Sequence, residues 1–442
     1  SKRLPEDPPV LEPLNGVGEY GGTHKLMQNS LASLSLDAQD IVDPMLFRPD
    51  PLGNNLIPSL VKDYKINENF TAITINLRKG LRWSDGELFT TDDFVYWWEA
   101  ELQNKDLNPI SPENWKPVGW EKLEQIDDYT FKIHFTETNP MFMKNIWNNL
   151  LSYGMFMPGV PEHFLKQYHP EYTKNKEELE KLIEEEGFDE WYEFYNYVKE
   201  NGRNQVKYPM PTLEAYIVKE SSSDSLLLER NPYYPFVDTE GNQLPYIDQM
   251  RINLVQDWEV YNAQVATGKA TTGVHRVSFS QTPLLKNYSD KENFHINMGQ
   301  KVHSAQVHFM PNMTHTDAEK REIFQKTKFR QALSLAINRD EINQTFYFNL
   351  GEPSAVTAHP ASPYYEEDFQ KYVDFNPEKA NKLLDEIGLV DKNGDGFRDY
   401  PDGDSFKLTI EYFAYQDIVP KVIEMVTAQW SEEIGVNVDS KQ

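Results

Sequence analysis

The sequence contains no cysteine in its 442 residues. Disulfides, thiolate metal sites, iron–sulfur clusters and a cysteine nucleophile are therefore excluded. Long apolar runs are absent as well, since none reaches the ~18–20 residues that a membrane-spanning helix needs. Residues 1–20 lack the apolar region of a secretory signal, so for an exported protein we expect that the signal has been removed.

Basic residues are few relative to acidic ones. The chain has 43 Lys and Arg against 70 Asp and Glu, which gives a formal net charge of -27 at pH 7. Such a charge repels nucleic acid, so nucleic acid is not expected as a partner. Aromatic residues make up 13% of the chain, too many for a disordered acidic protein. The chain also exceeds the ~250–300 residues at which single cores stop growing, which predicts two or three lobes.

Common catalytic motifs are also missing. The sequence has no H-E-x-x-H zinc motif, no G-x-S-x-G nucleophile elbow and no P-loop. GVGEYG at 16–21 matches the dinucleotide-binding spacing, but a proline-rich segment precedes it instead of a strand, so we set it aside. Carboxylates are so numerous that a glycosidase pair could be drawn almost anywhere, and no pair therefore indicates an enzyme.

The stretch INLRKGLRWSDGELFTTDDF, residues 75–94, encodes a strand, a turn and a capped helix. Apolar and polar residues alternate over 73–77, the period of a half-buried strand. Ser-Asp-Gly at 84–86 supplies turn residues. Thr90, with Asp93 three residues later, forms a capping-box pattern ahead of an aromatic helix. We call residues 75–94 the signature stretch.

Later segments predict further helices and strands. Residues 174–202 have helical spacing broken at Gly187, and the glutamate run within them is interpreted as a solvated face. Residues 376–388 form a helix with an asparagine cap, a proline in the first turn and a terminal glycine. A strand at 407–412, a helix at 418–433 and a strand at 436–438 make a β-α-β unit, which predicts a parallel pair in a larger sheet.

The signature stretch resembles that of extracellular solute-binding proteins of ABC importers, the oligopeptide/dipeptide/nickel-binding class. Other segments resemble the same family in the same order, at 21–23, 56–64, 127–131, 231–248 and 329–339. GKATTG around Gly268 departs from the glycine-glutamate-x-aspartate that is usual there. The matching signature residues are Leu77, Arg78, Gly80, Trp83, Ser84, Asp85, Gly86, Thr90, Asp93 and Phe94.

The resemblance implies an α/β, bilobal, periplasmic-binding-protein-like (type II) fold with an extra subdomain inserted in the first lobe. It also implies that the chain is incomplete at its C-terminus, because members continue beyond a strand like 436–438. The predicted domains are an extended arm at 1–19, lobe I at 20–40 and 201–255, the inserted subdomain at 41–200, and lobe II at 256–442.

The function implied by the resemblance is binding, without catalysis. An exported monomer, periplasmic or lipid-anchored on the outer face of the cell membrane, would capture a solute in a cleft between its lobes and deliver it to an ABC permease. An oligosaccharide or an oligopeptide is the expected solute, with a slight preference for the sugar. The alternative is an extracellular carbohydrate-active hydrolase. No cofactor is expected, calcium apart.

Pairs of an aromatic and a polar residue are the candidate ligand-binding groups. Flat aromatic faces cover the C–H surfaces of sugars, while amides and carboxylates bind hydroxyl groups or a peptide amino terminus. In relatives a loop near 108–120 faces the cleft, which favours the tryptophan there. The alternative for each tryptophan is packing in the core, and for the carboxylate at position 43 a solvated turn. The candidates are Trp115 with Asn114, Trp147 with Asn148, Trp258 with Asp257, and Asp43.

The stretch DKNGDGFRDYPDGD at 391–404 matches a calcium-loop pattern, in which alternating oxygen ligands surround a hard cation. Its twelfth position is Asp instead of the usual Glu, and no helix follows. Asn-Gly and Asp-Gly are also common turn dipeptides, so a solvated hairpin is the alternative. The candidate calcium ligands are Asp391, Asn393, Asp395, Asp399 and Asp402, with Gly396 at the bend.

Overall fold

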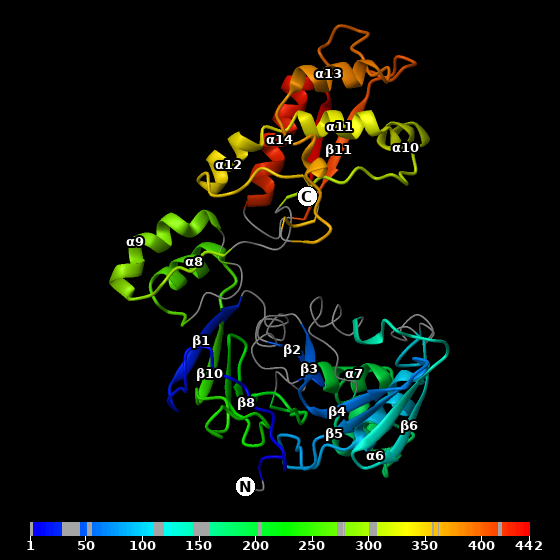
Figure 1. Ribbon diagram of the computed structural model, residues 1–442, viewed down its shortest axis with the longest axis vertical. Coiled ribbons are helices and arrows are strands. Elements are labelled where there is room, and N and C mark those ends of the chain that lie inside the picture. The colour runs from blue at the N-terminus through cyan, green and yellow to red at the C-terminus, as the bar shows by residue number, and fades with distance from the viewer. Residues whose placement is uncertain are drawn as a thin grey trace. The chain divides into compact units, whose positions relative to one another are not determined.

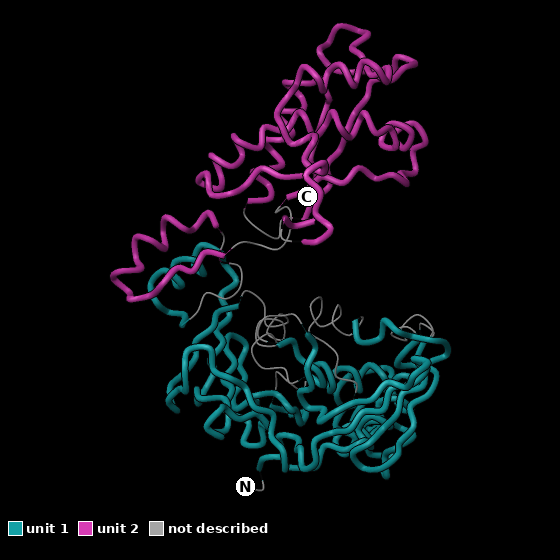
Figure 2. Tube along the Cα trace, viewed as in Figure 1, with its two compact units in different colours: residues 1–275 teal, residues 276–442 magenta. Residues whose placement is uncertain are grey.

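The computed structural model divides into two compact units, Ser1–His275 and Arg276–Gln442 (Figure 2). We call these unit 1 and unit 2. The domain boundaries predicted from the sequence, including the one after residue 255, stay predictions. The structure describes residues 3–28, 45–50, 55–109, 119–144, 159–201, 206–271, 277, 279–299, 307–355, 358–360, 362–413 and 418–442.

Unit 1 contains a four-stranded sheet of order β1-β10-β9-β8. Its strands are β1 (Thr23–Gln28), β8 (Tyr216–Ser221), β9 (Ser225–Arg230) and β10 (Gln249–Leu254). β1 pairs in parallel with β10, although the two are far apart in the sequence (Figure 1). The other neighbours are antiparallel.

A second sheet of unit 1 has the order β4-β5-β7-β6 and is antiparallel throughout. Its strands are β4 (Val61–Ile66), β5 (Ala72–Leu77), β6 (Trp120–Asp127) and β7 (Thr130–Phe135). A short antiparallel pair, β2 (Phe47–Pro49) and β3 (Leu56–Pro58), precedes it. The side chains of Ile73, Ile75 and Leu77 are buried, so the alternation predicted for β5 is confirmed.

The helices of unit 1 begin at the signature stretch. The capping box predicted there is confirmed, since Thr90 and Asp93 bond reciprocally at the start of α2 (Thr91–Tyr96). A π-helix, η2 (Trp97–Leu102), continues α2, and α5 (Glu162–Leu165) with the 3₁₀ turn η3 (Lys166–Tyr168) packs nearby. The helical segment predicted at 174–202 is two helices, α6 (Lys176–Glu185) and α7 (Trp191–Asn201). Gly187 separates them with a positive φ of 79°, a conformation that favours glycine.

One carboxylate explains why strand, turn and helix follow so closely in the signature stretch. Asp93 is 3% exposed and accepts hydrogen bonds from the Thr90 N–H (3.0 Å), the Glu162 N–H (3.1 Å) and the Trp83 indole (3.2 Å). Burial raises the pKa of the Asp93 carboxyl to about 7, although these hydrogen bonds favour its charged form. The turn, α2 and α5 therefore meet at a single buried group.

The N-terminal arm lies along unit 1 as an extended segment. The N–H of Leu11 donates to the carbonyl of Val237 (2.8 Å), and the Val237 N–H donates to the carbonyl of Pro9 (3.1 Å). Arg78 of the signature stretch forms an ion pair with Asp7 of the arm (2.9 Å). The arm predicted to be extended thus contributes contacts to the fold of unit 1.

The described residues of unit 2 are mainly helical, with one parallel pair of strands among them. The pair is β11 (Lys407–Glu411) and β12 (Asn437–Lys441), joined by α14 (Ile418–Ile434), so the predicted β-α-β unit is confirmed. Asn376 caps α13 and Gly388 follows it with a φ of 86°, as predicted. The remaining helices are η4 (Phe279–Gln281), α9 (Thr282–Glu292), α10 (Ala318–Gln325), α11 (Thr327–Leu335), α12 (Arg339–Tyr347), η5 (Glu367–Gln370) and α13 (Pro377–Asp385).

Each unit has its own core. In unit 1 both sheets and the signature stretch contribute to a large aromatic cluster that includes Trp83, Phe94 and Trp120. In unit 2 α11, α13 and α14 bury Phe329 and Trp430 with the apolar side chains of β11. No helix within the described ranges is both long and apolar enough to cross a membrane.

Candidate functional site

The carboxyl end of the parallel pair in unit 1 is the first candidate site. Ligands of open α/β sheets bind outside the carboxyl ends of parallel strands, where loops present side chains and free backbone groups. β1 ends at Gln28 and β10 at Leu254, and the Val255 N–H donates to the Gln28 carbonyl (2.6 Å). Gln28 is 5% exposed, so this edge holds a buried polar side chain.

Asp257 and Trp258, one of the predicted ligand-binding pairs, lie immediately beyond this edge. Asp257 is the N-cap of α8 (Trp258–Ala266), because its Oδ1 accepts hydrogen bonds from the N–H groups of Glu259 and Val260, both 2.9 Å. Trp258 is half-buried and its ring lies 5.4 Å from that of Tyr261. Trp258 thus combines packing with partial exposure, while the Asp257 carboxylate helps to begin the helix.

The other predicted ligand-binding residues lie outside the described residues. They stay predictions from the sequence. These residues are Asp43, Asn114, Trp115, Trp147 and Asn148.

Thr271 is a contact of unit 1 that the sequence reasoning missed. Its N–H donates to the Lys25 carbonyl (2.8 Å), and its Oγ1 accepts a hydrogen bond from the Lys25 N–H (3.0 Å). Thr271 belongs to the GKATTG segment, where the sequence departs from the expected family pattern. Thr271 therefore binds the edge of β1 that faces away from β10.

The carboxyl end of the parallel pair in unit 2 is the second candidate site. The Tyr412 N–H donates to the Lys441 carbonyl (3.0 Å), and Lys441 forms a long ion pair with Glu411 (3.6 Å). Beyond this end Phe413 is 81% exposed.

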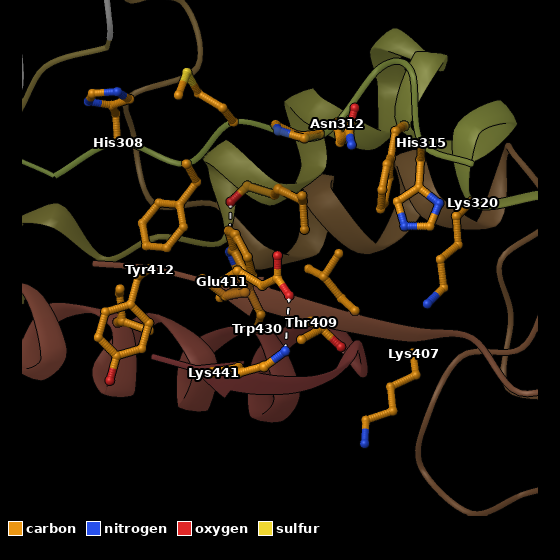
Figure 3. A pocket seen from close by; sticks show the side chains of 18 of the residues that line it. His308, Asn312, His315, Lys320, Lys407, Thr409, Glu411, Tyr412, Trp430 and Lys441 are labelled. Atoms are coloured by element: carbon orange, nitrogen blue, oxygen red, sulfur yellow. Dashed lines mark hydrogen bonds and ion pairs between the residues drawn. The ribbon is translucent and has the colours of Figure 1, made fainter. Parts of the chain in front are cut away.

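A groove with a volume of about 930 Å³ runs along β11 in unit 2 (Figure 3). Its apolar lining includes Phe309 and Trp430, whose rings lie 5.1 Å apart. The Trp430 indole N–H donates to the Leu333 carbonyl (3.0 Å), which fixes the tryptophan between α14 and α11. The sequence reasoning missed this groove, because its two walls, 307–316 and 407–413, are far apart in the chain. Its polar lining includes His308, His315, Lys320, Lys407 and Lys441.

The predicted calcium loop forms a series of hydrogen-bonded turns. Asp391 accepts hydrogen bonds from the N–H groups of Gly394 (2.7 Å) and Gly396 (3.0 Å), and these lower the pKa of its carboxyl. Buried Asp399 accepts one from the Lys392 N–H (2.9 Å). Among the described residues no three His, Asp or Glu side chains are grouped so that they could hold a metal ion. Calcium binding stays a prediction.

Comparison with known proteins identifies the family. The family model described as "Bacterial extracellular solute-binding proteins, family 5 Middle" matches residues 55–442. The periplasmic alpha-galactoside-binding protein of Rhizobium meliloti is 26% identical over 370 residues, which are 81% of this chain and 50% of that protein. Oligopeptide-binding protein AppA of Bacillus subtilis is 25% identical over 432 residues, 96% of this chain and 68% of that protein. The chain therefore spans between half and about two thirds of the length of these relatives.

Solved structures agree in fold. An oligopeptide-binding protein OppA is 32% identical with a TM-score of 0.74, and the match covers 100% of this chain and 68% of that one. The periplasmic binding protein MelB of Agrobacterium fabrum C58, solved with stachyose, is 24% identical with a TM-score of 0.68, covering 100% and 67%. The chain thus has a mixed α/β fold that matches periplasmic binding proteins, as the family resemblance implied. The chain belongs to the bacterial extracellular solute-binding proteins, family 5.

Proposed function

We propose that this chain is the solute-binding part of an ABC import receptor, which captures its solute outside the cytoplasm and delivers it to a membrane permease. The observation that carries the proposal is the family match, which extends over residues 55–442. Binding without catalysis agrees with the lack of common catalytic motifs in the sequence. The natural protein would be exported, periplasmic or lipid-anchored, and monomeric.

In this proposal the fold is that of a bilobal type II binding protein. The inserted subdomain predicted at 41–200 would correspond to the antiparallel sheet of β4 to β7 with its helices. The match with the OppA structure covers all of this chain and 68% of that one.

An oligosaccharide or an oligopeptide is the proposed solute. One relative is named for alpha-galactosides and another for oligopeptides, and their identities to this chain are nearly equal, 26% and 25%. Trp258 offers an aromatic face at the carboxyl end of β1 and β10, which suits a sugar ring. The predicted partners elsewhere, Trp115 with Asn114 and Trp147 with Asn148, belong to the same proposal. Asp43 is included as a polar group.

A thermal-shift titration tests the solute class. We would titrate the chain, and a longer natural form of it, with stachyose and separately with a defined set of short peptides. A ligand that binds only the folded state raises the unfolding midpoint by mass action, so a saturable rise with one class identifies it. Calcium and a chelator belong in the same assay, where a midpoint unchanged by chelation would remove the calcium prediction.

The hydrolase alternative needs a different measurement. Sustained release of smaller sugars from stachyose, proportional to enzyme concentration and time, would contradict the receptor proposal. Recovery of intact stachyose or intact peptide at one equivalent per chain would support it. Calorimetry supplies the stoichiometry, and chromatography of the recovered ligand shows whether it was cut.

A further inference from the structure

A second groove, with a volume of about 550 Å³, lies in unit 1 beside α6 and the start of α7. Its lining residues all come from 170–191. One stripe of α6 faces it, because Leu179, Glu180, Ile183 and Glu184 recur at the spacing of one helix face. The two apolar residues of the stripe are buried and the two glutamates are exposed. We call this groove the acidic pocket.

The aromatic part of the acidic pocket is held firmly by the residues behind it. Trp191 lines the pocket and is half-buried. The centres of the Trp191 and His169 rings lie 4.6 Å apart, and the Trp191 indole N–H donates to Asp106 (3.3 Å). Burial lowers the pKa of the His169 imidazole, so this ring is neutral at pH 7 and adds no positive charge beneath the pocket. The pocket therefore presents a fixed indole face.

The rim of the acidic pocket carries negative charge. Glu180, Glu184 and Asp189 line the pocket and are exposed. Within the described ranges, none of these three carboxylates forms a hydrogen bond or an ion pair with another residue. Lys176 is the one basic residue of the described lining, so three carboxylates face a single ammonium group. The rim thus has an excess of negative charge.

An aromatic face beside carboxylates suits a cation that also carries apolar surface. A guanidinium or ammonium group is attracted to the face of an indole ring, and the carboxylates supply ion pairs. The methylene groups of Arg and Lys side chains cover apolar surface such as that of Leu179 and Ile183. A bare metal ion does not fit, because no three His, Asp or Glu side chains of the described residues are grouped to hold one. The volume lies within the ~300–1,000 Å³ of ligand sites.

We propose that the acidic pocket binds a basic segment of a partner protein, with an arginine or lysine side chain over Trp191 and its charge beside Glu184. Charge complementarity with the rim carries the proposal, and the apolar stripe of α6 explains why a peptide segment suits the pocket better than a lone cation. The pocket shares no residue with the proposed solute site at the carboxyl end of β1 and β10. A failed solute screen would therefore leave this proposal standing, and the reverse also holds.

Fluorine NMR of the tryptophans locates the binding. The chain would be labelled with 5-fluorotryptophan, which gives a signal for each of its nine tryptophans, and the signal missing from Trp191→Phe belongs to Trp191. The probe is the tripeptide arginine-leucine-arginine with acetyl and amide ends, which offers no charged terminus to a peptide solute site. The Trp191 signal should shift saturably and by more than any other signal.

The same tripeptide with citrulline in place of both arginines is the ligand control. Citrulline keeps the length and nearly the shape of arginine but has no charge. It should bind about tenfold more weakly, because it loses both the attraction to the ring and the ion pairs. Calorimetry supplies the affinities of the two peptides.

Neighbouring glutamates provide matched variants, which are needed because the net charge of -27 attracts any basic peptide. Glu184→Gln should weaken the binding of the probe about two- to fivefold, as expected for an exposed ion pair. Glu185→Gln is the control, since Glu185 does not line the pocket and pairs with Lys181 instead (3.3 Å). Lys176→Gln should strengthen binding about twofold, because it removes the one positive charge of the described lining. If Trp191→Phe does not fold, these variants still decide.

Four outcomes would overturn the proposal. The first is equal affinity for the arginine and citrulline tripeptides, and the second is equal affinity of Glu184→Gln and Glu185→Gln for the probe. The third is a largest shift at another tryptophan, such as Trp258, which would assign the peptide to the solute site. The fourth is equally tight binding of N-acetylargininamide, which would show that a lone cation is enough. A selective shift of Trp191 that depends on arginine and on Glu184 supports the proposal.

Discussion

Each unit contains a parallel pair of strands, but the described residues surround the two pairs very differently. β1 and β10 lie in a four-stranded sheet, and the outer edge of β1 is bonded to Thr271. β11 and β12 form a sheet of two, whose open edge borders an apolar groove. The comparison teaches that the local pattern of a β-α-β segment predicts its parallel pair but not what borders the pair among the described residues.

The largest expected effect comes from removing a buried tryptophan of unit 1, and it tests whether the cores of the two units are independent. Trp83 is 1% exposed and packs within the signature stretch, so Trp83→Ala should cost about 3–5 kcal/mol of unfolding free energy, because a cavity forms and the bond to Asp93 is lost. Urea unfolding measures the loss, and amide exchange within β5 assigns it to unit 1. Equal loss of exchange protection in α11 would contradict independent cores.

The pH dependence of unit 1 should come partly from Asp93. Its carboxyl has a pKa of about 7 when folded against 3.8 as its ordinary value. Between these values the folded state binds the extra proton, so this group lowers the free energy of unfolding as pH rises from about 4 to about 7, by up to about 4 kcal/mol. Below pH 4 both states are protonated and the dependence ends.

Asp93→Asn is the control for this dependence, because it removes the titrating group. The difference in unfolding free energy between the natural chain and the variant, measured by urea titration at several pH values, should fall with rising pH across that window. A difference that rises with pH would mean that the three hydrogen bonds to Asp93 outweigh its burial.

The corresponding tryptophan substitution in unit 2 should cost less unfolding free energy. Trp430 is 2% exposed but lines the groove, so Trp430→Ala should cost about 2–3 kcal/mol, because solvent can enter the space left by the ring from the groove. Urea unfolding with amide exchange in α11 provides the measurement. A loss as large as that of Trp83→Ala would show that the groove is closed in solution.

The smallest expected effect concerns the carboxyl end of β1 and β10. Trp258→Ala should weaken the binding of the identified solute about tenfold, equivalent to about 1.4 kcal/mol, if its ring contacts that solute. Trp97→Ala is the matched control, since Trp97 is also half-buried but packs against Trp120 in another part of unit 1. Calorimetry gives the affinities. Unchanged affinity for Trp258→Ala would remove this residue from the site.

Local elements were predicted well because their signals are short-range. The capping box of Thr90 and Asp93, the cap of α13 and the break at Gly187 depend on residues within a few positions of one another. The site was predicted less completely. Of the four chosen groups only Asp257 with Trp258 lies within the described residues, and there the carboxylate caps a helix, a role that its place before a helical segment could have indicated.

The sequence by itself determined the elements, the family resemblance and the exclusion of cysteine chemistry, because composition and local spacing carry that information. Only the tertiary structure decided that β1 pairs with β10, that Asp93 collects donors from three elements, and that 307–316 and 407–413 face one groove. These contacts join segments far apart in the chain. Their partners are selected by the burial of shared apolar surface, which no short stretch of sequence specifies.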